Sequence, residues 1–135
     1  MGIRLSPYGA SNGLTAYDGL EETYARLANT LSEIGIAYIH IVDHSALGAP
    51  AVTRSVKAVI RQNFNGAVIL AGGYDRDRAE QDLNDGKGDL VAFGRPFIAN
   101  PNLVEKLADR AVLTAPDPGT FYTPGEKGYL DYQVN

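Results

Sequence analysis

Two glycine turns, each directly after a short apolar run, are the residues of this sequence best suited to hold an anion. Gly72-Gly73 follows the run Val68 to Ala71, and Gly94-Arg95 follows the run Leu90 to Phe93. Glycine lets a ligand approach the backbone closely, and arginine presents a fixed fork of donors to a phosphate. Taken together the two turns predict a phosphate site, although each glycine alone also fits a tight turn.

Arg4 lies inside an apolar run near the N-terminus, where an unpaired charge would be costly. The residues alone leave two interpretations open: an ion pair with a carboxylate such as Asp43, or a cation directed at an electron-rich ligand. His40 is expected to be a hydrogen-bonded core residue of a strand, and His44 lies in the loop after it. No carboxylate pair or Ser-His-Asp set has a spacing that predicts catalysis.

The segments that must position these residues alternate between apolar strands and amphipathic helices. Strands are predicted at 2–6, 36–42, 67–71 and 89–93, and helices at about 20–34, 51–63, 75–84 and 102–108. Four strand-helix repeats predict a parallel sheet of the α/β class, because each crossover joins parallel strands.

Capping residues mark the expected ends of these helices. Asp18 is the candidate cap of the first helix and Gly35 its stop. A short turn is expected after Gly94-Arg95, with Asn100 as the cap of the last helix and Pro101 at its first position. The loop 8–19 is rich in small residues.

Composition limits the classes of partner. The 135 residues carry a net charge of −4, so nucleic acid and anionic membranes are not expected partners. The chain has no cysteine, which rules out disulfides and thiolate chemistry. The N-terminal residues lack a signal-peptide pattern and no apolar run has membrane-spanning length. We therefore expect a cytoplasmic protein.

Five separated motifs, in order along the chain, resemble the Old Yellow Enzyme family of FMN-dependent ene-reductases. They are Gly2 to Pro7, Gly35 to His40, Ala71 to Asp75, Leu90 to Pro101, and the tail segments Thr120 to Tyr122 and Gly128 to Tyr132. The resemblance implies that the predicted strands correspond to strands five to eight of a TIM (β/α)₈ barrel. It implies a (βα)₄ half-barrel over residues 1–110 and an extension over 111–135 that packs across the site.

The resemblance also implies roles for individual residues. Ala71, Gly72 and Gly73, with Gly94 and Arg95, would hold the FMN phosphate, and Phe93 would lie beside the flavin. Arg4 would lie against the flavin and stabilise its reduced, negatively charged form. Tyr122 would contact the substrate or nicotinamide. In the family, NADPH or NADH reduces the FMN, which then reduces the C=C bond of an α,β-unsaturated carbonyl compound, such as a small-molecule enone.

The sequence also departs from the family pattern. The family's His-x-x-His or His-x-x-Asn pair and its proton-donating tyrosine have no match here, and neither His40 nor His44 corresponds to them. Four alternatives therefore stay open: an active enzyme portion, an FMN- or phosphate-binding half-barrel without turnover, a structural half-barrel, and a phosphosugar-binding half-barrel. Because four parallel strands leave two edges and a sheet face uncovered, we expect a homodimer or a complementary N-terminal half.

Overall fold

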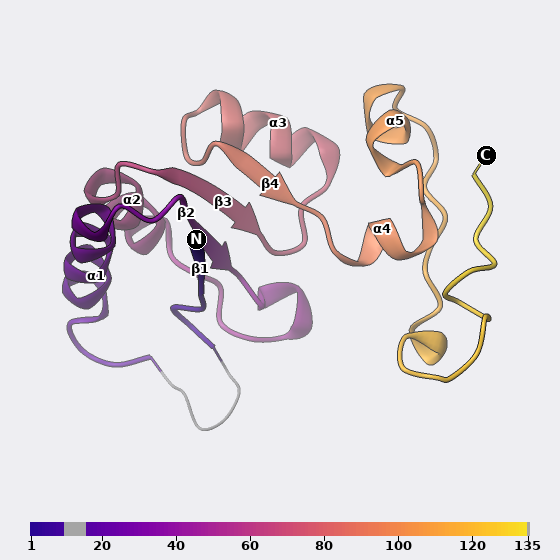
Figure 1. The fold of residues 1–135 in the computed structure, drawn as a ribbon, viewed down its shortest axis with the longest axis horizontal. Coiled ribbons are helices and arrows are strands. Elements are labelled where there is room, and N and C mark those ends of the chain that lie inside the picture. The colour runs from indigo at the N-terminus through magenta and orange to yellow at the C-terminus, as the bar shows by residue number, and fades with distance from the viewer. Residues whose placement is uncertain (10–15, 135) are drawn as a thin grey trace. The chain divides into compact units, whose positions relative to one another are not determined.

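The computed structural model describes residues 1–9 and 16–134, which form two compact units, 1–92 and 93–135. The first unit alternates strands and helices, as the sequence predicts (Figure 1). Its elements are β1 (Gly2–Leu5), α1 (Leu20–Ile34), β2 (Tyr38–Val42), the 3₁₀ helix η1 (Ser45–Leu47), α2 (Arg54–Asn63), β3 (Ala67–Ala71), α3 (Arg76–Asn84) and β4 (Leu90–Ala92). Part of the predicted loop 8–19 falls outside the described residues.

The four strands form one parallel sheet in the order β1-β2-β3-β4, so each crossover places the next strand beside the previous one. Register partners place Arg4, His40, Ile69 and Leu90 in one row across the sheet. Because side chains of a strand alternate between faces, this row shares one face with Ala71, two residues further along β3. The predicted parallel α/β sheet is confirmed as an open sheet of four described strands.

The opposite face of the sheet carries the core of the first unit. Ile39 and Ile41 of β2 and Val68 and Leu70 of β3 are almost fully buried. They lie on the side where α1 and α2 pack together and contribute buried residues such as Val56 and Ile60. Burial of a large aliphatic side chain contributes about 1.5–3 kcal/mol, so this face provides much of the unit's stability. We call it the covered face.

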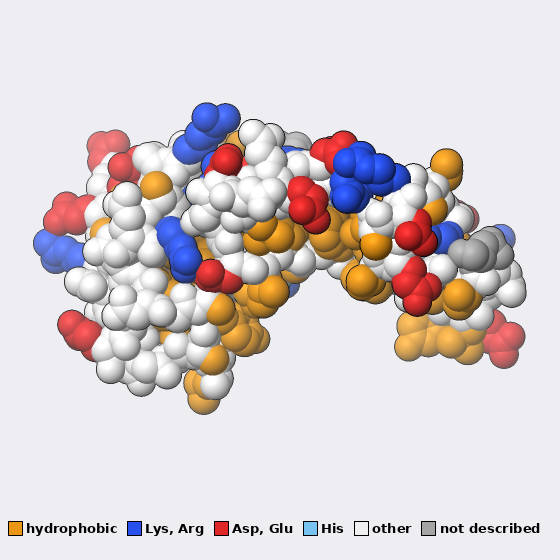
Figure 2. Space-filling model, turned by 90° about the horizontal axis from the view of Figure 1, so that it is seen from above, with side chains coloured by type: hydrophobic (Ala, Val, Ile, Leu, Met, Phe, Trp, Pro, Cys, Tyr) orange, Lys and Arg blue, Asp and Glu red, His pale blue; other side chains and the backbone are white. Residues whose placement is uncertain are grey.

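The face that carries the row of Arg4 and His40 is covered by none of the described helices of the first unit, and we call it the open face. Tyr38 and Leu90 remain 39% and 55% exposed there. Part of the open face is filled locally, since the Tyr38 ring occupies the space that a side chain at Gly2 would need. Hydrophobic side chains reach the surface in both units (Figure 2).

Helix ends explain where two predictions needed correction. Gly35 ends α1 in the left-handed conformation, with φ 77°, and its N–H bonds to Leu31 and Ser32, as predicted. The start of α1 is different, because Gly19 occupies the N-cap position and no side chain caps the helix. The prediction of Asp18 as the cap is therefore wrong. Helix α2 begins at Arg54 rather than near Ala51, since Thr53 accepts a hydrogen bond from Val56 N–H.

The second unit contains α4 (Arg95–Ala99), α5 (Leu103–Ala108) and the 3₁₀ helix η2 (Pro118–Thr120). The expected turn after Gly94-Arg95 is instead the helix α4, with Gly94 at its N-cap position. Asn100 does not cap α5, because Asn102 holds that position. The side chain of Asn100 is fully buried and instead joins Pro96, Thr114 and Lys106.

Candidate flavin site

Arg4 is exposed on the open face, at the register position of His40 on the neighbouring strand. It forms no hydrogen bond or ion pair with any described side chain. The alternative in which it pairs with Asp43 is wrong, because the Asp43 carboxylate lies 2.9 Å from Lys57 Nζ. Arg4 therefore presents an uncompensated cation on a face that no helix of its unit covers.

His40 was expected to be hydrogen-bonded, and for one ring nitrogen this is wrong. Its Nε2 is buried without a hydrogen-bond partner among the described residues. Burial, and then the positive charge of Arg4, lower the pKa of His40 below 6.5. A buried nitrogen without a partner is costly unless a ligand or water completes it. Side chains of β2 alternate between the two faces of the sheet, and His40 lies opposite Arg4 in the register. This alternation is the sequence signal that could have identified His40 as a neighbour of Arg4.

The turn at Gly72-Gly73 requires glycine for reasons internal to the first unit. Gly72 has φ 129° and Gly73 has φ 61°, both in the region that favours glycine. A Cβ at Gly72 would lie 2.6 Å from Asp43 Cβ, and one at Gly73 would lie 2.9 Å from Ala46 Cβ. Arg78 Nη1 donates to Gly72 O at 3.1 Å. The turn thus packs tightly against the loop after β2, with Ala71 half-buried at the end of β3.

Gly94 and Arg95 belong to the second unit and are arranged differently. A Cβ at Gly94 would meet nothing within 4 Å, so its surroundings are open. Arg95 begins α4 and is exposed, and its guanidinium makes no hydrogen bond or ion pair within the described part of the chain. Phe93, directly before them, is half-buried. The convergence of this turn with Gly72-Gly73 stays a prediction, since the two turns belong to different units.

Tyr122 lies after η2 in the second unit and is 98% exposed. Its ring meets Phe121 edge-on, with centroids 6.4 Å apart. Its predicted contact with substrate or nicotinamide therefore stays a prediction, as does the placement of the extension 111–135 across the site.

A cavity described in the first unit does not coincide with these residues. It lies on the covered face of the first unit and is lined by residues of α2 and α3 together with Asp43 and Leu70. The open face is a surface of a partial sheet rather than an enclosed pocket. We therefore assign the candidate flavin site from the unpaired charge and the open surface, and not from cavity size.

Comparison with known proteins supplies the family. The profile of the NADH:flavin oxidoreductase / NADH oxidase family matches residues 1–113. The chain belongs to this family. Putative 12-oxophytodienoate reductase 10 of Oryza sativa subsp. japonica is 35% identical over 98% of the chain and 44% of the relative. The predicted likeness to the Old Yellow Enzyme family is thereby confirmed.

Solved structures of this flavin oxidoreductase family share the fold. Morphinone reductase is 41% identical with a TM-score of 0.91, over 99% of this chain and 36% of that one. Its complex with tetrahydroNAD is 42% identical with a TM-score of 0.88, over 99% and 35%. The old yellow enzyme from Trypanosoma cruzi is 33% identical with a TM-score of 0.85, over 98% and 34%. The chain thus spans less than half the length of these relatives.

Proposed function

We propose that this chain is the FMN-binding portion of an NAD(P)H-dependent oxidoreductase that reduces the C=C bond of α,β-unsaturated carbonyl compounds. One observation supports the proposal most. The unpaired Arg4 lies on the open face at the register position of His40, whose buried Nε2 has no described hydrogen-bond partner. The chain that carries this pair belongs to a flavin oxidoreductase family. Bound FMN supplies hydride transfer. A cofactor that becomes more negative on reduction fits a surface with an uncompensated cation.

Individual residues of the chain have separate roles in this proposal. Arg4 holds the electron-rich edge of the flavin and stabilises negative charge there. Gly94 leaves open space for a phosphate, and Arg95 supplies a free guanidinium to it. Gly72 and Gly73, with Ala71, form the other side of the phosphate site, and Phe93 packs beside the ring. Tyr122 contacts the enone or the nicotinamide of NADPH or NADH.

A second candidate is a half-barrel that binds FMN or phosphate without reducing an enone. It is favoured because neither His40 on the open face nor His44 in the loop after β2 matches the pair that holds a substrate carbonyl in the family. In both candidates the open face and the edge strands β1 and β4 are completed by a second copy or a complementary half. A cytoplasmic location stays a prediction; none of the described helices is long and apolar enough to cross a bilayer.

The visible spectrum of the purified chain tests the flavin proposal. The chain is incubated with FMN, and free FMN is then removed by gel filtration. We expect flavin absorbance to remain with the protein after this step. NADPH oxidation stimulated by cyclohexenone would favour the enzyme, and bound flavin without such stimulation would favour the second candidate. A chain that binds no FMN, although correctly folded, would contradict both.

The phosphate assignment has its own variant. Arg95→Ala is expected to weaken FMN binding by about 1.5–3 kcal/mol, because a charge-assisted hydrogen bond to phosphate is lost. Arg26→Ala, on α1 and outside both proposed phosphate sites, is the matched control and should leave FMN affinity unchanged. Equal affinity in Arg95→Ala and the unaltered chain would show that this arginine does not hold the phosphate.

A further inference from the structure

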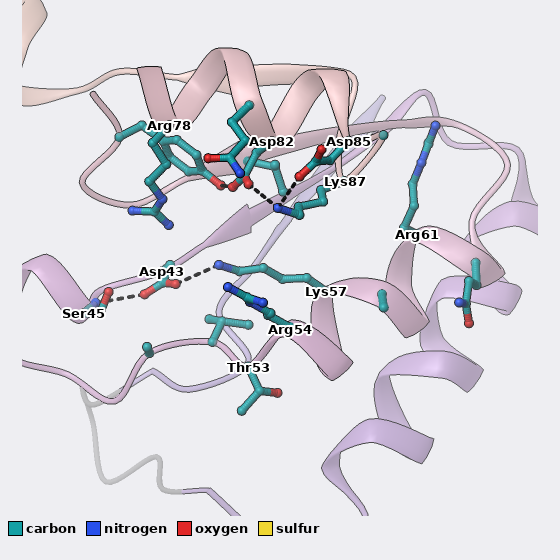
Figure 3. Close-up of a pocket in the computed structure, with 18 residues that line it drawn as sticks. Asp43, Ser45, Thr53, Arg54, Lys57, Arg61, Arg78, Asp82, Asp85 and Lys87 are labelled. Atoms are coloured by element: carbon teal, nitrogen blue, oxygen red, sulfur yellow. Dashed lines mark hydrogen bonds and ion pairs between the residues drawn. The ribbon is translucent and has the colours of Figure 1, made fainter. Parts of the chain in front are cut away.

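The cavity on the covered face is a separate feature of the first unit and does not depend on the flavin proposal. It has a volume of about 870 Å³, within the size range of small-molecule sites. Helix α2 and the loop before it form one wall and α3 the other (Figure 3). Buried Val52 and Leu70 supply apolar surface inside it.

Basic side chains outnumber carboxylates in the lining of this cavity. The basic residues are Arg54, Lys57, Arg61, Arg78 and Lys87, and the acidic ones are Asp43, Asp82 and Asp85. The two lysines pair with all three carboxylates, so these five residues together have a net charge of −1 and the positive charge of the lining comes from its three arginines. Lys57 pairs with Asp43 at 2.9 Å, and Lys87 pairs with Asp82 at 2.6 Å and Asp85 at 2.9 Å. The lining therefore retains positive charge that its own carboxylates do not balance.

Arg61 is satisfied by a carboxylate outside the lining, which leaves two arginines. Its guanidinium binds Asp89 through two hydrogen bonds of 2.9 and 3.0 Å. The guanidinium of Arg54, the first residue of α2, makes no hydrogen bond or ion pair within residues 1–9 and 16–134. Arg78 lies 4.1 Å from the centroid of the Tyr74 ring and donates to the carbonyls of Gly72 and Gly73. Its charge also acts on Asp82, but the two side chains form no described ion pair.

The two arginines come from opposite walls, Arg54 beside Lys57 on α2 and Arg78 on α3 (Figure 3). Guanidinium groups bind phosphoryl oxygens through paired hydrogen bonds, and two of them on facing walls suit a dianion. Helix α2 is ten residues long, and the positive end of its dipole lies at its N-terminus, where Arg54 is the first helical residue. The apolar surface of Val52 and Leu70 suits the uncharged body of an organic phosphate.

We propose that this cavity binds a small phosphate monoester, with Arg54 and Arg78 holding its phosphoryl group from the two walls. The ligand's uncharged body lies against Val52 and Leu70. Lys57 contributes positive potential while it remains paired with Asp43. This site differs from the proposed flavin site in both its residues and the face of the sheet that it uses.

Phenyl phosphate is a suitable probe, and isothermal titration calorimetry on the whole chain measures its affinity. We expect saturable binding that is tighter than that of inorganic phosphate. Arg54→Ala should weaken binding about tenfold or more, as should Arg78→Lys, which keeps the charge but loses the paired donors. Arg26→Ala is the control, because Arg26 lies on α1 and pairs only with Glu22 among the described residues.

Arg95→Ala separates this cavity from the proposed flavin phosphate site. If the phosphate monoester binds in the cavity, Arg95→Ala leaves its affinity unchanged while Arg54→Ala lowers it. The reverse pattern, or no binding at millimolar probe concentrations, would overturn the proposal. Thermal unfolding of each variant confirms that it is folded, and Arg54 is exposed and unpaired, so its loss should not disturb the fold.

Discussion

Arg4 is the residue on which the proposed flavin site depends most. In the described structure it faces no carboxylate, and its nearest titratable neighbour by register is the histidine whose pKa it lowers. Burial of the imidazole, and then the positive charge of Arg4, disfavour the protonated form of His40. Because Arg4 is the second of these two causes, the change in the His40 pKa when Arg4 is replaced measures the electrostatic effect of Arg4.

Replacement of Arg4 by Gln is expected to raise the pKa of His40 towards 6.5, since one of the two causes that lower it is removed. NMR titration of the imidazole carbon and proton shifts measures this change. The folded chain binds this proton less tightly than the unfolded chain, so folding stability falls as the pH drops below 6.5, and Arg4→Gln should reduce that loss. An unchanged His40 pKa would show that the Arg4 side chain does not lie close enough to His40 to affect its protonation.

The pair of Asp43 and Lys57 is the most buried ion pair described, with 2% of the Asp43 side chain exposed. Burial raises the pKa of Asp43, but hydrogen bonds from Ser45 and Lys57 outweigh it and the net pKa lies below 3.8. Its contribution to stability is thus complete above pH 3.8 and is lost as the pH falls through the lowered folded-state pKa.

Lys57→Met should destabilise the chain by about 3–5 kcal/mol at neutral pH, because it leaves a buried carboxylate without its partner. Chemical denaturation measures the loss. Lys127→Met, in the tail of the second unit and outside any described ion pair, is the control. A loss no larger than that of the control would mean that water replaces the lysine.

At the scale of elements, strands and long helices were predictable because their apolar spacing is set by local geometry. Strand β3 was predicted to the residue, and α1 ends at the glycine expected. Helix α4 was missed because Gly94 and Pro96 are typical of a turn and only five residues are helical. Asn100 followed by proline is a usual cap signature, but its side chain is bound by Lys106 and Thr114, and sequence spacing does not reveal such contacts.

The candidate site was predictable only in part, for the same reason. Glycine turns and an arginine after a strand are visible in the sequence, so the sequence predicts them as candidate residues, and their role stays a prediction. The unpaired nitrogen of His40 depends on the register between β1 and β2. The cavity between α2 and α3 depends on how two crossovers pack on one face, so the guanidiniums of Arg54 and Arg78 gave no signal in the sequence.

The two glycine turns differ in a way that substitution can reveal. Gly72→Ala should destabilise the chain by about 1–3 kcal/mol, because alanine is strained at φ 129° and its Cβ would collide with Asp43. Gly94→Ala should change stability by less than about 1 kcal/mol, since φ is −96° and the space is open. Thermal unfolding compares them. Equal losses would show that Gly94 also has a packing role.

For the whole molecule, the open face and the edge strands favour association. Leu90 is exposed on that face beside Ile69, at the edge of the sheet. Leu90→Glu should weaken self-association, because it places a charge where apolar surface would be buried. Analytical ultracentrifugation at micromolar concentrations measures this.

Ile34→Glu is the matched control for Leu90→Glu. Ile34 is similarly exposed but lies at the end of α1, away from the open face. It should leave the association unchanged. A folded monomer at every concentration would contradict a second copy as the partner.

The sheet order has a further consequence for such an assembly. Strand β1 is at one border of the sheet and β4 at the other, and both run in the same direction. Each chain thus has two different sheet edges, and the β4 edge of one chain can pair with the β1 edge of the next in a head-to-tail arrangement. If the twist of two paired sheets brings the free β4 edge back to the free β1 edge, the assembly closes as a ring of two chains. If it does not, further chains add to the free edges and the assembly becomes a fibre.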